Sequence, residues 1–312
     1  MMKQNVKYYT NYTIIIPHYN NPHLLRRCLA SIPNREDVQI IVVDDCSSEE
    51  VQIDLREMER RFLNVQFVYS DKNLGGGHAR NIGLQYAEGK YILFADADDF
   101  FHDNLNAFLD DYKEEKCDIV YFNTDAVDSN TLQPYPSRSD RLQSYISSNT
   151  DKKANELRFL FPAPWCKMVR KELIDNYQIK FDELFFINDA TFSYLTGYYA
   201  KDIKVDKRIV YCVTYRPDCL TFTDSLKKEL VRVGVMSRKN RFLKDHNISV
   251  FDKEMLLPIR KSLKKGEWRC LKAYFSITRK YGYSMLFCLS KIGTEAAKCR
   301  IRNFFNSKCI LL

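Results

Sequence analysis

Residues 91–99, Tyr-Ile-Leu-Phe-Ala-Asp-Ala-Asp-Asp, join an apolar run directly to three carboxylates. The first five residues predict a buried β-strand, because a short continuous apolar run is typical of a strand covered on both faces. Asp96, Asp98 and Asp99 follow where the chain leaves the core, and like charges about 4 Å apart cost on the order of 4 kcal/mol at an effective dielectric near 20. A divalent cation that prefers oxygen ligands, Mg²⁺ or Mn²⁺, would remove this repulsion. The segment therefore predicts a metal site at the carboxyl edge of a sheet, where open α/β folds bind their ligands.

Strand and helix patterns alternate on both sides of this segment. The apolar runs predict strands, and the apolar positions at helical spacing predict helices between them. The expected strands cover residues 12–17, 38–43, 65–69, 91–95 and 119–123, and the expected helices 20–32, 49–62, 79–87 and 105–115. This alternation predicts an α/β fold with a doubly wound, mixed but mostly parallel sheet. Residues 125–151 are polar and contain Pro134 and Pro136, so we expect a long loop or an irregular excursion there.

The positive charge of the chain is concentrated near its C-terminus. The 312 residues carry a net charge of +8, with 45% hydrophobic and 28% charged residues, which is ordinary for a folded globular protein. Residues 251–312 contain 14 Lys and Arg against 4 Asp and Glu, whereas the first 250 residues are close to neutral. We expect a domain over residues 1–223, with halves at about 12–123 and 155–223, and a basic helical region over 224–312.

The ten cysteines form no Cys-x-x-Cys pair and no regular framework. Reduced thiols in a cytoplasmic protein are the simplest interpretation. The polar N-terminus shows no signal-peptide pattern, and no apolar stretch reaches 18 residues. His102 follows the carboxylates closely enough that a role at the metal site stays open.

Basic and aromatic residues alternate in the C-terminal region. Lysines and arginines at 261–280 are interleaved with Trp268, Tyr274 and Phe275, and more basic residues follow at 298–302. This combination favours contact with an anionic membrane surface. A helical subdomain with a solvated basic face explains the same pattern. Nucleic-acid binding shares the electrostatic footprint, but we do not expect it.

Three further motifs come before the carboxylates. Ile16-Pro17-His18-Tyr19-Asn20 ends the first expected strand, and Val43-Asp44-Asp45-Cys46-Ser47 ends the second. Residues 73–83, with four glycines and Arg80, open a helix whose start favours anions. Each has a simpler explanation on its own, namely a turn, a helix cap or an exposed helix cation. The glycines match neither the P-loop nor the dinucleotide-binding pattern.

Taken in order, the four motifs resemble those of the family 2 inverting glycosyltransferases with the GT-A fold. The resemblance covers about residues 12–215, and their order and spacing make the set specific. The middle of the chain also fits: the segment at 163–173 resembles the family's acceptor-side segment, and the segments at 181–183 and 188–192 follow it. Where the family often has Glu-Asp, this chain has Asn188-Asp189, so the aspartate is kept and its neighbour is neutral.

The resemblance implies a role for each matching residue. Pro17 and Tyr19 would line the base pocket, and Asp44 or Asp45 would bind the uracil edge or the ribose. Arg80 would lie near the base or the diphosphate. The other roles are metal ligation by Asp98, contact with the ribose or a metal-bound water by Asp96, general base catalysis by Asp189, and acceptor contacts from the segment that holds Trp165 and Lys167. The simpler explanation of Trp165, a packed core aromatic, is preferred over stacking on an acceptor sugar, and Asp189 has a helix cap as its alternative explanation.

The resemblance also implies the chemistry. The protein would move a hexosyl or N-acetylhexosaminyl group from a UDP-linked donor to a glycan or lipid-linked acceptor, with Mn²⁺ or Mg²⁺ as cofactor. Bacterial surface polysaccharide synthesis, as a peripheral protein at the inner membrane face, is the implied setting. A sugar nucleotidyltransferase is the alternative enzyme, although it would need a basic, glycine-rich signature after the first strand. The non-enzymatic alternative is a membrane-associated adaptor with a degenerate transferase domain.

Overall fold

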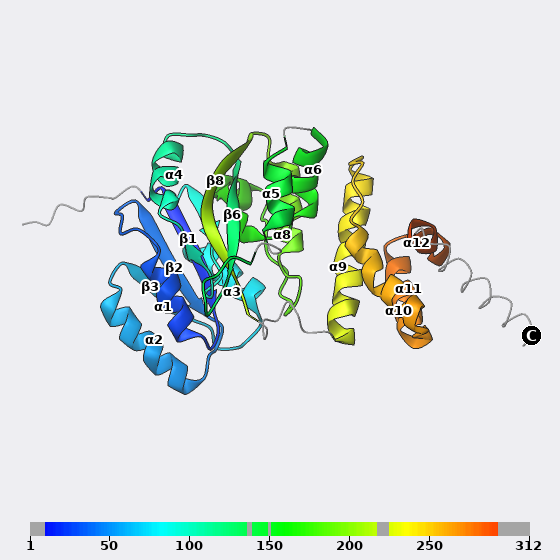
Figure 1. The fold of residues 1–312 in the computed structure, drawn as a ribbon, viewed down its shortest axis with the longest axis horizontal. Coiled ribbons are helices and arrows are strands. Elements are labelled where there is room, and N and C mark those ends of the chain that lie inside the picture. The colour runs from blue at the N-terminus through cyan, green and yellow to red at the C-terminus, as the bar shows by residue number, and fades with distance from the viewer. Residues whose placement is uncertain (1–9, 136–138, 149–150, 217–224, 293–312) are drawn as a thin grey trace, which may run out of the picture. The chain divides into compact units, whose positions relative to one another are not determined.

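The computed structural model describes residues 10–135, 139–148, 151–216 and 225–292. The chain divides into two compact units, Met1–Cys219 and Leu220–Leu312 (Figure 1). The first unit holds the sheet, and the second is helical over the residues described.

A mixed sheet forms the centre of the first unit, with eight strands among the described residues in the order β3-β2-β1-β4-β7-β6-β8-β5. The strands are β1 (Tyr12–His18), β2 (Val38–Asp44), β3 (Val65–Tyr69), β4 (Tyr91–Phe94), β5 (Phe100–Phe101), β6 (Ile119–Asp128), β7 (Lys167–Arg170) and β8 (Ile203–Tyr215). Strands β1 to β4 are mutually parallel, whereas β7 runs antiparallel to both of its neighbours. This pattern confirms the predicted mixed sheet.

The strand order reverses between β1 and β4. The chain passes from β1 outward through β2 to β3, and then returns to place β4 on the other side of β1. At such a switch point the loops after the two strands diverge and leave a crevice at the carboxyl edge, where doubly wound sheets bind their ligands. Tyr19 follows β1 and Asp96 follows β4, so this edge carries two of the predicted motifs.

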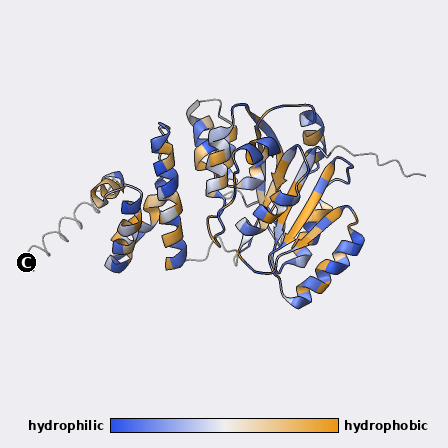
Figure 2. Ribbon diagram, turned by 180° about the vertical axis from the view of Figure 1, so that it is seen from behind, coloured by the Kyte–Doolittle hydropathy of each residue, from blue (hydrophilic) through white to orange (hydrophobic). Residues whose placement is uncertain are grey.

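The core fills both faces of the parallel strands. Ile14, Ile41 and Ile92 are fully buried and occupy successive strands, as expected for strands covered by helices on both sides. The hydrophobic strands and the polar outer face of α2 are visible in Figure 2. The helices of this unit are α1 (Pro22–Ala30), α2 (Glu49–Arg61), α3 (Gly76–Tyr86), α4 (Asn104–Tyr112), α5 (Asp140–Ile146), α6 (Asp151–Leu160), α7 (Lys171–Asn176) and α8 (Ala190–Tyr199), with a 3₁₀ turn, η2, at Pro164–Cys166.

The prediction of a loop or irregular excursion over residues 125–151 is wrong for much of that range. Strand β6 continues to Asp128, and α5 lies within the same stretch. The end of β6 is polar because its exposed side chains alternate with buried ones, while its backbone pairs with β8 as far as Asp128↔Tyr215. Polarity therefore marked a half-exposed paired strand. Residues 136–138 and 149–150 of the predicted loop lie outside the described residues.

The second unit consists of helices around a small core. They are α9 (Leu226–Asp245), η4 (Lys253–Leu256), α10 (Leu257–Lys265), α11 (Trp268–Lys280) and α12 (Met285–Ile292). A buried ion pair joins Lys239 to Asp252 at 2.7 Å, and Asn240 hydrogen-bonds to the backbone of Asp252. None of the helices that the structure describes is both long and apolar enough to span a membrane. The basic residues at 298–302, which form part of the predicted membrane-binding region, lie outside the described residues.

Candidate active site

The first two motifs lie at the carboxyl ends of β1 and β2. Tyr19 is 47% exposed, so its ring is free to stack on a flat ligand. Asn20 follows with a positive φ of 52°, a conformation that asparagine tolerates better than most residues and that turns the chain sharply away from the strand. Pro17 is partly buried within β1, opposite Val43.

Asp44 and Asp45 are almost fully buried, and both accept hydrogen bonds from nearby groups of the protein itself. Asp44 accepts hydrogen bonds from His18 Nδ1 at 2.9 Å and from the hydroxyl and amide of Ser47. Asp45 accepts from the amides of Leu74 and Gly75, at 3.1 and 2.7 Å, directly before α3. Burial raises the pKa of Asp45, and the two amides oppose that effect. Asp45 thus fixes the glycine-rich turn. Either carboxylate could accept a hydrogen bond from a nucleobase only through the lone pairs that these contacts leave free.

Asp96, Asp98 and Asp99 form the predicted carboxylate cluster after β4. Each places an oxygen within 4.8 Å of the others. Asp99 is buried and accepts hydrogen bonds from Tyr211 Oη and the Thr214 amide. Burial, followed by the charges of Asp98 and Asp96, raises the pKa of Asp99 well above its usual range. The buried carboxyl of Asp99 therefore connects the loop after β4 to β8.

Asp98 is held in place by residues that the sequence motifs do not include. Its backbone carbonyl accepts hydrogen bonds from Arg27 and Thr214, while its Oδ2 pairs with Arg216 at 2.7 Å. Its Oδ1 has no hydrogen-bond partner among the residues described. Oxygen donors from Asp96 and Asp98 suit Mg²⁺ or Mn²⁺, so the donor set fits the predicted ion. An ion bound there would share Asp98 with Arg216, which the fold brings to the cluster from the end of β8.

Arg80 connects the carboxylate cluster to the segment that carries Asp189. It forms an ion pair with Asp96, and its Nη1 donates to Asn188 Oδ1 at 3.3 Å. Its guanidinium also lies over the ring of Phe181, 5.4 Å from the centroid. Asn188, the neutral neighbour of the predicted base Asp189, therefore serves as a hydrogen-bond acceptor for Arg80. Arg80 is only 7% exposed, so this connection is part of the packed structure.

Asp189 occupies the N-cap position of α8 but its side chain makes no capping hydrogen bond. The simple explanation of Asp189 as a helix cap is thus not supported. Burial raises the pKa of Asp189, and the positive charge of Arg80 opposes the shift. Both Arg80 and Asp96 act electrostatically on this carboxyl, which places the predicted base near the predicted donor site.

Gly77 allows α3 to pack closely against the segment before Asp189. A Cβ at this position would lie 2.1 Å from the carbonyl oxygen of Asp182 and 2.8 Å from Cβ of Asn188. Real Cβ atoms do not approach so closely, so only glycine fits without displacing the backbone of that segment. The glycines thus serve helix–loop packing beside the site.

We expect Gly77→Ala to lower the free energy of unfolding by about 1–3 kcal/mol, as overpacking does, and to lower transferase activity as well. The methyl group must push away the segment that positions Asn188 and Asp189. Gly234→Ala is the matched control, because its Cβ would meet only Ile277 Cγ2 at 3.8 Å. Urea unfolding measures both variants, and equal stability of Gly77→Ala and wild type would contradict the packing described.

Two residues predicted on the acceptor side are placed in the core instead. Lys167 is fully buried, and its Nζ donates to Ser193 Oγ at 3.0 Å and contacts the carbonyl of Phe161. Trp165 is 8% exposed and stacks on Tyr211, with centroids 5.8 Å apart. Neither side chain faces solvent, so we correct the prediction of direct acceptor contacts: Trp165 and Lys167 support Tyr211 and α8 from within. Their apolar and basic character alone did not distinguish core from surface.

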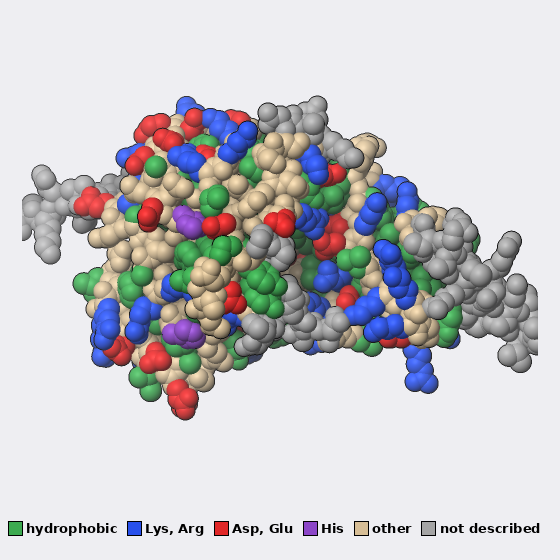
Figure 3. Space-filling view, viewed as in Figure 1, with side chains coloured by type: hydrophobic (Ala, Val, Ile, Leu, Met, Phe, Trp, Pro, Cys, Tyr) green, Lys and Arg blue, Asp and Glu red, His purple; other side chains and the backbone are tan. Residues whose placement is uncertain are grey.

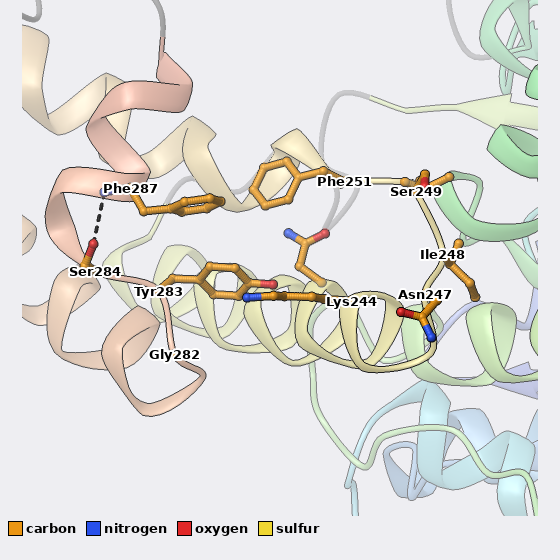
Figure 4. A pocket seen from close by; sticks show the side chains of 11 residues that line it. Lys244, Asn247, Ile248, Ser249, Phe251, Gly282, Tyr283, Ser284 and Phe287 are labelled. Atoms are coloured by element: carbon orange, nitrogen blue, oxygen red, sulfur yellow. Dashed lines mark hydrogen bonds between the residues drawn. The ribbon is translucent and has the colours of Figure 1, made fainter.

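The second unit contains a cavity of about 750 Å³ that includes none of the predicted site residues. Its lining combines the aromatic rings of Phe251, Tyr283 and Phe287 with polar side chains such as Lys244 and Asn247 (Figure 4). The volume is within the range of small-molecule sites. The predicted donor-side and base residues all lie in the first unit.

Comparison with known proteins gives a family model and several relatives. The model of glycosyl transferase family 2 matches residues 13–178. The putative glycosyltransferase EpsH of Bacillus subtilis is 25% identical over 252 residues, which are 75% of this chain and 70% of EpsH. The poly(ribitol-phosphate) β-N-acetylglucosaminyltransferase TarS of Staphylococcus aureus is 30% identical over 113 residues, or 33% of this chain and 20% of TarS. The chain thus spans much of EpsH but only a fifth of full-length TarS.

Two solved structures are similar in fold. Residues 1–349 of S. aureus TarS, in complex with UDP-GlcNAc, match with a TM-score of 0.59 and 20% identity over 93% of this chain and 78% of that one. The mannosyltransferase PcManGT of Pyrobaculum calidifontis, in complex with GDP-Man and Mn²⁺, matches with a TM-score of 0.56 and 14% identity over 96% of this chain and 81% of its own. At these identities the likeness concerns the fold.

Proposed function

This chain belongs to glycosyl transferase family 2 and has the GT-A fold, and on that premise we propose that it is a metal-dependent, inverting transferase. It would take a hexosyl or N-acetylhexosaminyl group from a UDP-linked donor and attach it to a hydroxyl of a glycan or lipid-linked acceptor. Relatives named for poly(ribitol-phosphate) glycosylation and for minor teichoic acid biosynthesis support a role in surface polysaccharide assembly.

One observation carries the proposal. Arg80 bridges Asp96, which belongs to the carboxylate cluster, and Asn188, which precedes the partly buried residue Asp189. A donor diphosphate held at the cluster would then lie beside a group able to accept a proton. Transfer needs these two elements close together, since a base must reach the acceptor hydroxyl directly or through one water.

The residues of the chain divide the work. Tyr19 offers its exposed ring to the base, and Arg80 offers positive charge near the diphosphate. Mn²⁺ or Mg²⁺ at Asp98 and Asp96 would supply Lewis-acid stabilisation of the leaving diphosphate. Asp189 accepts the proton of the acceptor hydroxyl while that oxygen attacks the anomeric carbon from the face opposite the departing diphosphate. A single displacement of this kind inverts the configuration at that carbon.

A screen of donors tests the proposed activity. The full chain is incubated with UDP-, GDP- and dTDP-sugars and Mn²⁺, and melting temperature and donor hydrolysis are recorded for each. We expect UDP-sugars to raise the melting temperature most, because ligands that bind only the folded state stabilise it. If added pyrophosphate converts a nucleotide sugar to a nucleoside triphosphate and a sugar 1-phosphate, the result would favour a nucleotidyltransferase. If no donor changes the melting temperature or is hydrolysed, the result would favour the non-enzymatic adaptor.

Arg216→Ala should have opposite effects on the ion and on the donor. Since Arg216 pairs with Asp98, its removal should tighten Mn²⁺ binding several-fold without donor. It should also weaken UDP binding, because the diphosphate loses the guanidinium that the ion would release. Calorimetry measures both affinities, with Arg216→Lys as the charge-conserving control. Looser Mn²⁺ binding in Arg216→Ala would contradict this competition.

We propose in addition that the second unit contacts an anionic membrane at the cytoplasmic face. Exposed basic residues on α10 and α11 include Lys265, Arg269 and Lys272. Trp268, next to Arg269 in sequence, is 39% exposed, and Leu286 on α12 is 71% exposed. The face of this unit seen in Figure 3 shows more Lys and Arg than Asp and Glu side chains. Amphipathic helices of this composition bind anionic lipid interfaces.

Charge reversal tests the membrane contact without removing any part of the fold. Arg269→Glu with Lys272→Glu should reduce co-sedimentation with phosphatidylglycerol vesicles, and added salt should reduce wild-type binding as well. Arg56→Glu with Arg60→Glu, on the exposed face of α2, is the matched control. Equal loss in both double variants, or none in either, would return the basic helices to a solvated structural role.

A further inference from the structure

A second group of metal-binding side chains lies on β6, on β8 and directly after β5, apart from the Asp96–Asp99 carboxylates. His102, Asp125 and Cys212 each place a possible ligand atom within 4.8 Å of the other two. We infer that this His102–Asp125–Cys212 group binds one transition-metal ion of the Zn²⁺ class. An imidazole nitrogen, a carboxylate oxygen and a thiolate sulfur are the three ligand types that such ions accept, and a fourth position would remain for water.

The backbone register of the sheet brings the three residues together. Asp125 of β6 is paired with Cys212 of β8, and Phe100 of β5 is paired with Cys212 from the other side. Residues opposite one another in paired strands point to the same face, with Cβ atoms about 4.5–5.5 Å apart. His102 lies two residues beyond Phe100, and its amide continues the pairing by donating to the carbonyl of Val210 at 2.9 Å. Its side chain therefore lies on the face that Cys212 occupies.

The distances and exposures suit an ion that enters from solvent. His102 Nε2 lies 2.8 Å from Asp125 Oδ1, and these two side chains are 33% and 35% exposed. Cys212 is fully buried and closes the site from below. Zn–N and Zn–S bonds of about 2.0–2.3 Å put two ligands of a tetrahedral ion roughly 3–4 Å apart, so small side-chain rotations complete the geometry.

A simple ion pair between His102 and Asp125 explains only part of this arrangement. It leaves out the thiol of Cys212, which occupies the position paired with Asp125 and interacts with that carboxylate as well. All three side chains therefore converge on one point. A metal ion would fasten the two-residue strand β5 to its neighbours. Thr214, two residues beyond Cys212, supports Asp98 and Asp99, so the same ion would steady the donor site.

Co²⁺ substitution tests the inference on the full chain after removal of metals. Wild type should bind Co²⁺ with a thiolate-to-cobalt charge-transfer band in the near ultraviolet and visible bands of a tetrahedral ion. Cys212→Ser should lose the charge-transfer band, and His102→Gln should bind Co²⁺ at least tenfold more weakly. Zn²⁺ should raise the melting temperature of wild type but not of Cys212→Ser.

Two control variants separate this group from the donor site and from other thiols. Asp98→Asn should keep the charge-transfer band, because its carboxylate belongs to the other cluster. Cys46→Ser should also keep it, because Cys46 is a partly exposed thiol elsewhere. The inference is overturned if wild type shows no thiolate band, if the band survives in Cys212→Ser, or if Asp98→Asn abolishes it. Failure here would leave the proposed transferase activity untouched, since that activity depends on Asp98 and Asp189.

Discussion

Asp98→Asn is expected to lower the rate of Mn²⁺-dependent sugar transfer by about a thousandfold or more. A metal ion contributes several kcal/mol to stabilisation of developing charge, and each 1.36 kcal/mol corresponds to a tenfold change in rate. The asparagine keeps the size of the side chain and removes the charge that would hold the ion. The substitution also weakens the pairing with Arg216. Because the Arg216 side chain is partly exposed, water can solvate its charge in the variant. Steady-state kinetics with the UDP-sugar identified by the donor screen measures the effect.

Asp71→Asn is the control for this experiment. Asp71 is exposed, and among the residues that the structure describes its side chain has no hydrogen-bond partner, while its backbone carbonyl accepts from the Cys46 thiol. This variant should match wild type in both activity and melting temperature. Full activity of Asp98→Asn at saturating donor would remove Asp98 from the metal site and leave the carboxylate cluster with a structural role only.

Asp189→Asn should lower kcat by about 10²–10⁴-fold, the usual contribution of a positioned general base, while donor affinity changes less than about twofold. Asparagine retains the shape of the side chain at the start of α8 but cannot accept the proton. Asp189 makes no capping hydrogen bond that the substitution would break, so the melting temperature should stay within a few degrees. Calorimetric titration with UDP separates binding from catalysis, and an equal loss in both would contradict a role as base.

The pH profile of kcat provides an independent check on Asp189. Burial raises the pKa of this carboxyl, Arg80 and Lys167 lower it, and Asp96 raises it further, with a net upward shift. A base acts in its deprotonated form, so kcat should fall as pH decreases through the raised pKa, at a higher pH than for an ordinary aspartate. The low-pH limb should disappear from the residual activity of Asp189→Asn. A limb that persists unchanged would belong to another group.

The parallel half of the fold was predictable because its strands are short, continuous and apolar. Residues 65–69 form β3 as predicted, and β1, β2 and β4 end within one residue of the expected positions. Helix α3 begins at Gly76, earlier than the predicted Ala79, because glycines weaken the helical pattern while tertiary packing fixes the helix. The short strands β5 and β7 carried no periodic signal, and the polar end of β6 was mistaken for a loop.

The site divides along similar lines. Asp96, Asp98 and Arg80 could be located from motifs, because consecutive charged residues after an apolar strand are visible in the sequence. Arg216 and Tyr211 could not, because they reach the cluster from β8, more than a hundred residues away. Lys167 was wrongly predicted to contact the acceptor for a related reason. The sequence does not show that its ammonium group is hydrogen-bonded in the core by Ser193 and a backbone carbonyl. The double aspartate at 44–45 similarly concealed that both carboxylates bind their own loops.

Calorimetric titration of UDP into the full chain, with and without Mn²⁺, tests the central claim most directly. If Asp98 holds an ion that bridges to the diphosphate, wild type should bind UDP at least tenfold more tightly with Mn²⁺ than with EDTA, and Asp98→Asn should lose that difference. Equal affinity of wild type under both conditions, or an undiminished Mn²⁺ effect in Asp98→Asn, would contradict the account.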